Sequence, residues 1–548
     1  MLSVIKRGIL LYAISWVSWR LLRRFFVKTD LDNLPGPEPA SLLQGNFGEL
    51  FHFQSWGSHK YLADHFGRFI RIYGPLRSSQ LYVFDPKALH HIIVKDQNIF
   101  EEPPAVISNS SLFFGEGILA SLGERHRKQR KMLNPVFSVA HMRNMVPMFN
   151  DVAKKLEQAI KFNIARGRHE IDILHWMSRA ALEMIGQSGL GYSFDSLVEG
   201  AEPHPYSKAA KELVPVSSAM AFEMHFLLPL VYKIGSPRFR RFLVDLIPSE
   251  NVRRLRDIVN TMDQTTIQIF NEKKKALAEG DEALLKQVGQ AKDIMSILMK
   301  ANMEADEADR LPDDQVLGQM SSLTFAATDT TSNALSRILY LLSIHPEAQD
   351  RLRAEVTACL KTHGSENIPY DELVALPFMD AICRETLRLY PPVPTVVRTA
   401  RQDAVVPLLE PIRGRDGREI HSVLVPKDTS VFISILNANR DPTLWGADAL
   451  EWKPERWLSP LPQALQDAHV PGIYSHLMTF LGGGRACIGF KFSQLEMKVV
   501  LSTLISHFRF SLSDREIDWV MSGIVTPTVK GSLQPQLPLR VELVEMCA

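Results

Sequence analysis

The sequence predicts an α+β fold that is mainly helical, with small β-sheets, in one large domain. Long stretches have helical periodicity with charged faces, above all residues 141–299 and 313–344. Short strand-like runs at residues 69–73 and 81–84 are bounded by turn residues. No linker-like stretch follows residue 40, so residues 41–548 are expected to form a single body.

Composition limits the functional classes. The 548 residues are 45% hydrophobic and 22% charged, with a formal net charge of +1, which is ordinary for a globular protein. A nucleic-acid partner would favour a strong basic excess, so none is expected. The four cysteines form no CxxC pair, which argues against a disulfide framework and favours a reducing compartment.

The N-terminus is expected to be a membrane anchor, residues 1–28. Residues 8–19 carry no charge and are flanked by Lys6 and Arg7 before and by four basic residues after. The run is shorter than the roughly 20 residues of a spanning helix, but snorkelling basic side chains would extend it to residues 2–22. The more basic flank follows the run, which leaves the body in the cytoplasm. A cleaved signal peptide is the alternative, but no A-x-A site follows.

The segment after this anchor is rich in proline. Residues 34–39 read Leu-Pro-Gly-Pro-Glu-Pro, and proline fixes φ and resists helix continuation. Residues 29–40 are therefore expected to be a stiff hinge before the body.

The body alternates short strands with longer helices. Helices are expected at residues 86–94, 123–132, 313–344, 379–390 and 490–507, and short strands and turns over 393–435.

Cys487 lies in a glycine-rich loop just before one of these helices. A helix N-terminus favours negative charge and lowers a thiol pKa. The three glycines at 482–484 are expected to let the backbone approach a flat ligand closely, and Arg485 can meet an anionic group on that ligand. The alternative is a buried structural cysteine in a Gly-rich turn.

The loop resembles the haem-binding signature F-x-x-G-x-R-x-C-x-G of cytochrome P450, matched at Phe480, Gly483, Arg485, Cys487 and Gly489. The resemblance implies the cytochrome P450 fold, a triangular helical body with an N-terminal membrane helix. It also implies haem b as cofactor, with Cys487 as the axial ligand of its iron. A thiolate ligand pushes electron density onto the iron and favours O–O cleavage.

Two further motifs match this family in the expected order. Glu385 and Arg388 form an E-x-x-R pair on one helix face, although a surface ion pair looks the same. Arg456, in a Pro-Glu-Arg-Trp run, resembles the arginine that completes a buried structural network with them.

The long helix at 313–344 contains the run Ala-Ala-Thr-Asp-Thr-Thr at 326–331. It resembles the family's oxygen-activating kink, with Ala327 in place of the usual glycine. The resemblance implies that Thr330 hydrogen-bonds the oxygen molecule and that Asp329 passes protons inward, as catalytic residues. The alternative is a packed helix whose hydroxyls bond back to its own backbone.

Basic residues are the candidate cofactor-binding groups. The resemblance implies that His126 and Arg130, one helical turn apart, and Arg398 hold the haem propionates, together with Arg485. The other charges of residues 125–131 have two interpretations, a solvated helix face or a docking patch for an acidic electron donor.

The resemblance implies a fungal microsomal monooxygenase in the endoplasmic reticulum membrane. It would use O2 and electrons from NADPH through NADPH–cytochrome P450 reductase. The apolar stretches 106–119, 214–230, 323–327, 394–397 and 523–528 favour a large lipophilic substrate that enters from the membrane lipid. A terpenoid or sterol, such as a lanostane-type triterpenoid of secondary metabolism, is the leading expectation.

Other functions remain open. Aromatic or fatty acyl compounds are alternative substrates, which would make the enzyme one of detoxification. A haem-thiolate isomerase or dehydratase would need no reductase, and a membrane haem carrier would catalyse nothing. The Asp329-Thr330 pair argues against both of these.

Overall fold

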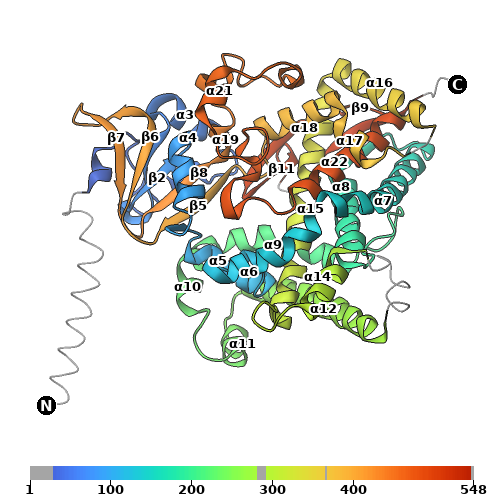
Figure 1. Cartoon of the computed structure of the whole chain (residues 1–548), viewed down its shortest axis with the longest axis horizontal. Coiled ribbons are helices and arrows are strands. Elements are labelled where there is room, and N and C mark those ends of the chain that lie inside the picture. The colour runs from blue at the N-terminus through green and yellow to red at the C-terminus, as the bar shows by residue number, and fades with distance from the viewer. Residues whose placement is uncertain (1–28, 281–291, 365–366, 533, 545–548) are drawn as a thin grey trace.

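The computed structural model describes residues 29–280, 292–364, 367–532 and 534–544, and Figure 1 shows its arrangement. The anchor expected at residues 1–28 lies outside the described residues. The chain is mainly helical with small sheets, as the sequence predicts.

The longer elements are helical. The α-helices are α2 (Phe47–Leu50), α3 (Trp56–Phe66), α4 (Pro86–His90), α5 (Pro104–Phe114), α6 (Gly123–Leu133), α7 (Val139–Ala165), α8 (Ile173–Ile185), α9 (Pro205–Ala219), α10 (Leu228–Val231), α11 (Pro237–Asp245), α12 (Glu250–Glu279), α14 (Ile294–Glu304), α15 (Asp313–Ile344), α16 (Pro346–His363), α17 (Tyr370–Ala375), α18 (Pro377–Leu389), α19 (Ile435–Ala438), α20 (Pro442–Trp445), α21 (Gln463–Ala468) and α22 (Phe490–His507). Short 3-10 or π turns are η1 (Asp30–Asn33), η2 (Pro75–Arg77), η3 (His91–Lys95), η4 (Ile118–Ala120), η5 (Asn134–Phe137), η6 (Gly186–Leu190), η7 (Glu223–Leu227), η8 (Pro454–Leu458), η9 (Met478–Phe480) and η10 (Gly483–Arg485).

Within the described residues the strands form four small sheets. The largest has the order β1-β2-β8-β5-β3, in which only the β2–β8 pair is parallel. The others are β4-β12-β9 and the hairpins β6-β7 and β10-β11. The strands are β1 (Phe69–Tyr73), β2 (Ser79–Val83), β3 (Phe100–Glu101), β4 (Glu170–Asp172), β5 (Thr395–Ala400), β6 (Ala404–Arg413), β7 (Glu419–Val425), β8 (Ser430–Ser434), β9 (Phe508–Leu512), β10 (Ile517–Ser522), β11 (Ile524–Val529) and β12 (Pro538–Leu543).

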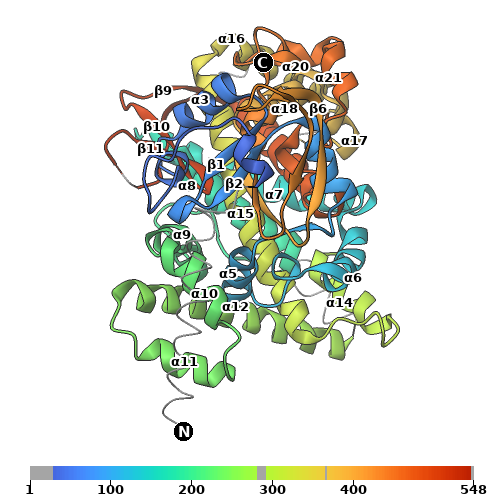
Figure 2. The ribbon, with the colours of Figure 1, turned by 90° about the vertical axis from the view of Figure 1, so that its left-hand side faces the viewer.

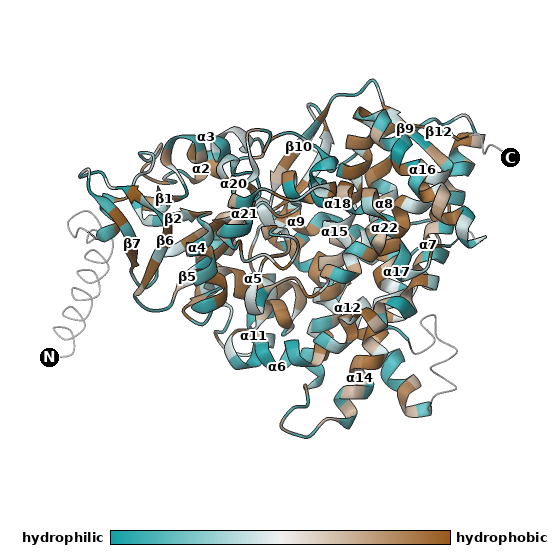
Figure 3. Cartoon of the chain, turned by 45° about the horizontal axis from the view of Figure 1, so that its top comes forward, coloured by the Kyte–Doolittle hydropathy of each residue, from teal (hydrophilic) through white to brown (hydrophobic). Residues whose placement is uncertain are grey.

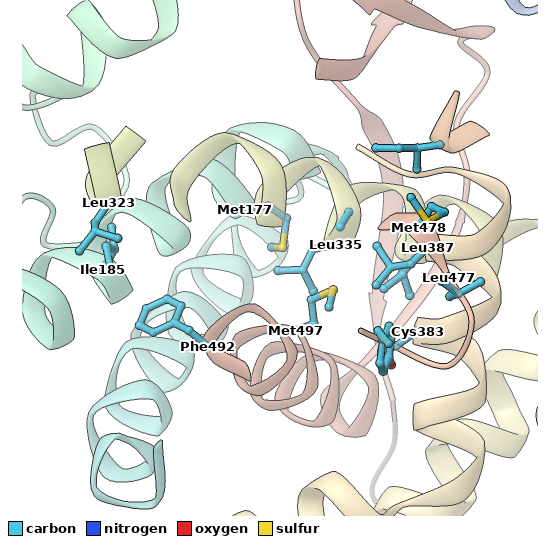
Figure 4. Close-up of a cluster of buried hydrophobic side chains, with 14 of the residues drawn as sticks. Met177, Ile185, Leu323, Leu335, Cys383, Leu387, Leu477, Met478, Phe492 and Met497 are labelled. Atoms are coloured by element: carbon cyan, nitrogen blue, oxygen red, sulfur yellow. The ribbon is translucent and has the colours of Figure 1, made fainter. Parts of the chain in front are cut away.

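Helix α15 crosses the middle of the molecule (Figure 1) and contacts α8, α12, α16, α18 and α22. Figure 4 shows part of the resulting core, where Met177 of α8, Leu335 of α15 and Met497 of α22 point toward one another. All three side chains are at most 1% exposed. The helices differ in polarity: α6 is largely hydrophilic, whereas α22 is largely hydrophobic (Figure 3). This packing fixes the helix ends that carry the site.

Some predicted elements have the predicted bounds and others are shifted, since the strand expected at 81–84 is Ser79–Val83 and the helix expected at 379–390 is Pro377–Leu389. The helices at 313–344 and 490–507 begin and end where expected. The helix expected at 86–94 is divided, because α4 ends at His90 and the π turn η3 follows. Pro86 begins α4, and Asp85 caps it by accepting a hydrogen bond from the Ala88 N–H at 2.8 Å.

The proline-rich segment is packed on the body. The Arg71 N–H donates to the Pro35 carbonyl at 2.9 Å, and Gly36 lies so close to Arg71 that a Cβ there would meet its carbonyl oxygen at 1.9 Å. Arg415, in the β6–β7 turn, pairs with Glu38 at 2.9 Å. The segment 29–40, which was expected to be a stiff hinge, therefore packs against β1 and the β6–β7 hairpin.

No single described helix has the length and hydropathy of a membrane span. One pair does together, α9 with residues 223–231, and it is bent by 84°.

Candidate functional site

The Cys487 loop is held from several sides. The Cys487 N–H donates to the Phe480 carbonyl at 2.9 Å, and the Gly484 N–H donates to Gln97 Oε1 at 2.8 Å. A Cβ on Gly483, whose φ is +64°, would meet the Ile93 carbonyl oxygen at 2.0 Å. The glycines are thus needed for contact with η3 and Gln97, on the protein side of the loop. The sequence-based reason, close approach of the backbone to a ligand, stays a prediction.

A cavity of about 510 Å³ opens on Cys487. It brings together most of the residues that the motifs single out, although they come from α6, α15, β5 and the cysteine loop. Those that line it are His126, Arg130, Thr330, Arg398, Arg485 and Cys487. Asp329 does not line it. The remaining lining is mainly apolar.

Three arginines surround this cavity. Arg130 Nη1 donates to the Ala486 carbonyl at 2.7 Å, beside the cysteine. Arg485 donates to the Ser121 carbonyl at 2.8 Å and pairs with Glu102 at 3.2 Å. Arg398 pairs with the same carboxylate at 3.4 Å. Because two arginines share one carboxylate, the site carries surplus positive charge and fits an anionic ligand.

The pKa values of two groups that line the cavity, His126 and Cys487, are shifted from their ordinary values. Burial, with Arg485 and Arg130 nearby, lowers the pKa of His126 to about 3, so its imidazole is neutral. Burial also raises the pKa of the Cys487 thiol, against the lowering effect of the Gly489 N–H and Arg130. The Cys487 side chain is nevertheless exposed to the cavity, and the lowered pKa expected for a ligand thiolate stays a prediction. A bound metal deprotonates a coordinating thiol regardless.

A buried ionic network lies behind this loop. Arg388 makes two hydrogen bonds to the Glu385 carboxylate, both at 2.8 Å, and both side chains are 0% exposed. The Trp457 indole N–H donates to the Glu385 carboxylate at 3.0 Å. Arg456 Nε lies 3.5 Å from the same carboxylate. Arg388 also donates to the carbonyls of Asn439, Ala449 and Glu451. The E-x-x-R pair is thus fully buried and is not a surface ion pair.

Comparisons with known proteins decide the family. A cytochrome P450 family model matches residues 35–535. The chain belongs to the cytochrome P450 family. A cytochrome P450 monooxygenase of Postia placenta is 52% identical over 99% of both chains. A ganoderic acid synthetase of Ganoderma lucidum is 45% identical over 96% of this chain and 97% of its own. A P450 monooxygenase of Hericium erinaceus is 37% identical over 96% of both.

This cytochrome P450 is a haem-dependent monooxygenase. The residues of the cavity fit the cofactor, since a thiol faces a space bordered by surplus arginine charge. Cys487 would hold the iron, and His126, Arg130, Arg398 and Arg485 would hold the propionates. The haem, when bound, supplies the activation of O2.

Two neighbouring polar residues of α15, Asp329 and Thr330, differ in their position relative to the P450 cavity. Thr330 lines the cavity, and its hydroxyl donates to the Ala326 carbonyl at 2.8 Å. Asp329 does not line the cavity, and burial raises its pKa to about 6, partly offset by Lys211 of α9. The helix is unbroken from Asp313 to Ile344, so the expected kink is not a break in the helix.

The stretches expected to bind substrate divide into two groups. Parts of 106–119, 323–327 and 394–397 line the P450 cavity, whereas no residue of 214–230 or 523–528 does. Phe222, expected near substrate, is instead 64% exposed and Phe226 is 38% exposed. Sequence analysis missed several lining residues from separate elements, because no local motif marks them: Glu102, Phe137, Ile185 and Phe492.

Proposed function

We propose that this P450 oxidises a large lipophilic substrate, with a terpenoid or sterol, such as a lanostane-type triterpenoid, as the leading class in fungal secondary metabolism. The observation that carries the proposal is the apolar wall above Cys487, which includes Val106, Leu119, Leu323 and Val396. The similarity to a ganoderic acid synthetase supports the substrate class. Aromatic or fatty acyl substrates are the second candidate, since the same wall has no charge that selects against them.

The electron donor is proposed to be NADPH–cytochrome P450 reductase, docked on α6. A basic hollow of about 330 Å³ lies here, lined among others by His126, Arg127, Arg130, Lys131 and Arg485. Three of these residues also line the Cys487 cavity, so one layer of side chains separates the two. Such a surface attracts an acidic partner and gives electrons a short path. Lys131 is 73% exposed, although it already pairs with Asp309 at 2.8 Å.

A location in the endoplasmic reticulum membrane is also proposed. The α10–α11 region, at one edge of the molecule (Figure 2), exposes large apolar side chains next to arginines. Leu230 is 73% exposed, Leu246 is 63% and Phe242 is 58%. An apolar surface with a basic rim suits the boundary between lipid headgroups and acyl chains.

Reconstitution tests the substrate proposal. Microsomes that contain this chain and the reductase are fed lanostane-type triterpenoids, sterols, fatty acids and small aromatics, and products are read by mass spectrometry. We expect a +16 Da product, with label from ¹⁸O2, from a triterpenoid or sterol, and only with NADPH and reductase. Oxidation of fatty acids or aromatics alone would reject the substrate class, and turnover without NADPH would reject the monooxygenase cycle.

Asp329→Asn is expected to change activity and stability in opposite directions. Loss of the proton relay should lower turnover by about 10²–10⁴-fold. The folded pKa of about 6 lies above the ordinary value of 3.8, so the folded protein binds more protons between these values and its stability falls as pH rises through them. The variant should therefore be more stable by up to about 3 kcal/mol at pH 7.5 and unchanged near pH 3.5.

Urea unfolding at the two pH values, beside substrate turnover, measures both effects. Thr328→Ser, which lies on the same helix and is buried, is the control. Normal turnover of the Asp329→Asn variant would remove Asp329 from the proton path.

A further inference from the structure

A second and larger cavity lies apart from Cys487. Its volume is about 850 Å³, and it shares no lining residue with the Cys487 cavity. Residues from α3, the end of α18, the β6–β7 hairpin, α15 and β10 form its wall. The wall is rich in apolar and aromatic side chains, among them Trp56, Phe84, Leu389, Tyr390, Leu436 and Trp519.

The unusual feature of this wall is Arg337 of α15. The side chain is 6% exposed, and its guanidinium lies 3.3 Å from the ring centroid of Trp519 and 4.1 Å from that of Tyr390. Within the described residues it makes no hydrogen bond or ion pair, and its buried Nε has no partner. An arginine stays charged in proteins, so this is a buried cation that lacks an anion.

Arg388 shows how the same fold treats a buried arginine elsewhere. It has a carboxylate, Glu385, at 2.8 Å and three carbonyl partners. Aromatic rings stabilise a cation from above and below, but they leave the N–H groups at the edge of the guanidinium unsatisfied. Arg337 therefore keeps an unused hydrogen-bonding edge beside an open cavity.

The carboxylates on the same wall do not supply the missing anion. Asp441 pairs with Arg68 at 2.6 Å, and Asp85 accepts the N–H groups of Ala88 and Leu409. Asp64 pairs with Lys60. Glu410, which is 78% exposed, lies 3.8 Å from Arg68, and Asp518 makes no ion pair with Arg337 among the described residues.

A second cation, the half-buried Arg440, increases the positive charge. Arg440 lies 5.2 Å from the ring centroids of both Tyr390 and Trp56 and donates to the Leu389 carbonyl at 2.7 Å. It has no carboxylate partner among the described residues, and its charge acts on Arg337. Two neighbouring guanidiniums, neither of them paired with a carboxylate among the described residues, favour an anion that enters the cavity beside them.

We propose that this cavity binds a lipophilic carboxylate, with its carboxylate on Arg337 and its hydrocarbon body along the aromatic and aliphatic wall. The planar guanidinium edge matches a carboxylate. The apolar wall selects against a free inorganic anion, which would leave it uncovered. The carboxylate has two sources, a membrane fatty acid or a polycyclic terpenoid acid.

Photo-crosslinking tests the site in the full-length holoenzyme, held in nanodiscs of neutral lipid. The probe is a stearic acid that carries a diazirine, with its methyl ester as the uncharged comparison, and labelled peptides are mapped by mass spectrometry. We expect the acid to label the peptides that contain Trp56 and Trp519 at least about tenfold more than the ester does. Equal labelling by acid and ester would overturn the proposal, and this comparison needs no variant.

Variants then test the assigned residue. Arg337→Gln should reduce labelling by the acid at least about tenfold, and Arg337→Lys should retain part of it. Lys60→Gln is the matched control, because Lys60 is a rim cation that pairs with Asp64, and it should leave labelling unchanged. Unchanged labelling of an Arg337→Gln variant with normal haem content would overturn the assignment.

Competition identifies the source of the ligand. Unlabelled stearate or a triterpenoid carboxylic acid should displace the probe, and the stronger competitor names the source. An azole that binds the haem iron should not displace it, because the cavities are separate. Displacement by millimolar inorganic phosphate as effective as that by stearate would overturn the lipophilic class.

Discussion

Replacement of Cys487 by alanine is expected to remove the absorption peak near ~450 nm of the reduced, CO-bound enzyme and to abolish oxygen insertion. Among the described lining residues Cys487 is the sole cysteine of the cavity, so no other thiolate can replace it. Alanine keeps the Cβ, and the loop is held by main-chain bonds such as that from the residue 487 N–H to Phe480. The fold should therefore survive.

The same spectrum distinguishes a thiolate ligand from a histidine ligand of the haem iron. The neutral imidazole of His126 also lines the cavity, so the variant is expected to show a peak near ~420 nm or no haem, and in neither case thiolate character. Cys359→Ser is the control, because Cys359 is half-buried on α16 and does not line the cavity. A Cys487→Ala protein with the ~450 nm peak and normal turnover would refute the ligand assignment.

Sequence reasoning succeeded where a feature is local. The bounds of α15 follow from Pro312 before it and His345-Pro346 after it, since proline marks helix starts. The cysteine loop and the E-x-x-R pair are read directly because their residues are close in the sequence. Glu385 and Arg388 do not line the Cys487 cavity, so their place beside the cysteine loop was expected only from the family's order of motifs.

Features that depend on tertiary packing were not predictable. The Glu102 carboxylate forms ion pairs with Arg398 and Arg485, which lie hundreds of residues further along the chain. No sequence pattern around Glu102 signals these ion pairs. Helical periodicity in residues 214–230 predicts an apolar face, but it cannot say whether that face meets substrate or the exterior. Phe222 lies on the exterior. The close packing of Gly483 against Ile93 of η3 is a further contact that no local pattern signals.

The unpaired state of Arg337 also depends on tertiary packing and was therefore not predictable. In the sequence Arg337 is the one basic residue of helix α15, and a solvated position would be the ordinary interpretation. The fold places the rings of Trp519 and Tyr390 against its guanidinium, from segments about 180 and 50 residues further along the chain. A buried cation without a partner becomes visible only after the fold has fixed all its neighbours.

Glu385→Gln is expected to prevent accumulation of the holoenzyme. The substitution keeps the side-chain volume but removes the charge that compensates Arg388, and both side chains are 0% exposed. Removal of one partner from a buried ion pair costs roughly 3–5 kcal/mol, which is a large part of the roughly 5–15 kcal/mol that stabilises a typical protein. The three carbonyls that Arg388 contacts and the Trp457 indole would also lose their fixed positions behind the cysteine loop.

Thermal unfolding and the CO difference spectrum measure this effect in parallel. Asp448→Asn is the matched control, because Asp448 pairs with Arg456 at 2.8 Å in the same network but is 30% exposed, so solvent can replace its charge. We expect the control to retain most of its haem and the Glu385→Gln protein to retain little, with a lower unfolding temperature. Glu385 does not line the Cys487 cavity, so its effect must pass through the fold. If Glu385→Gln bound haem with normal yield and normal thermal stability, the network would not support the cysteine loop, and the position of Cys487 would have to rest on its main-chain hydrogen bonds alone.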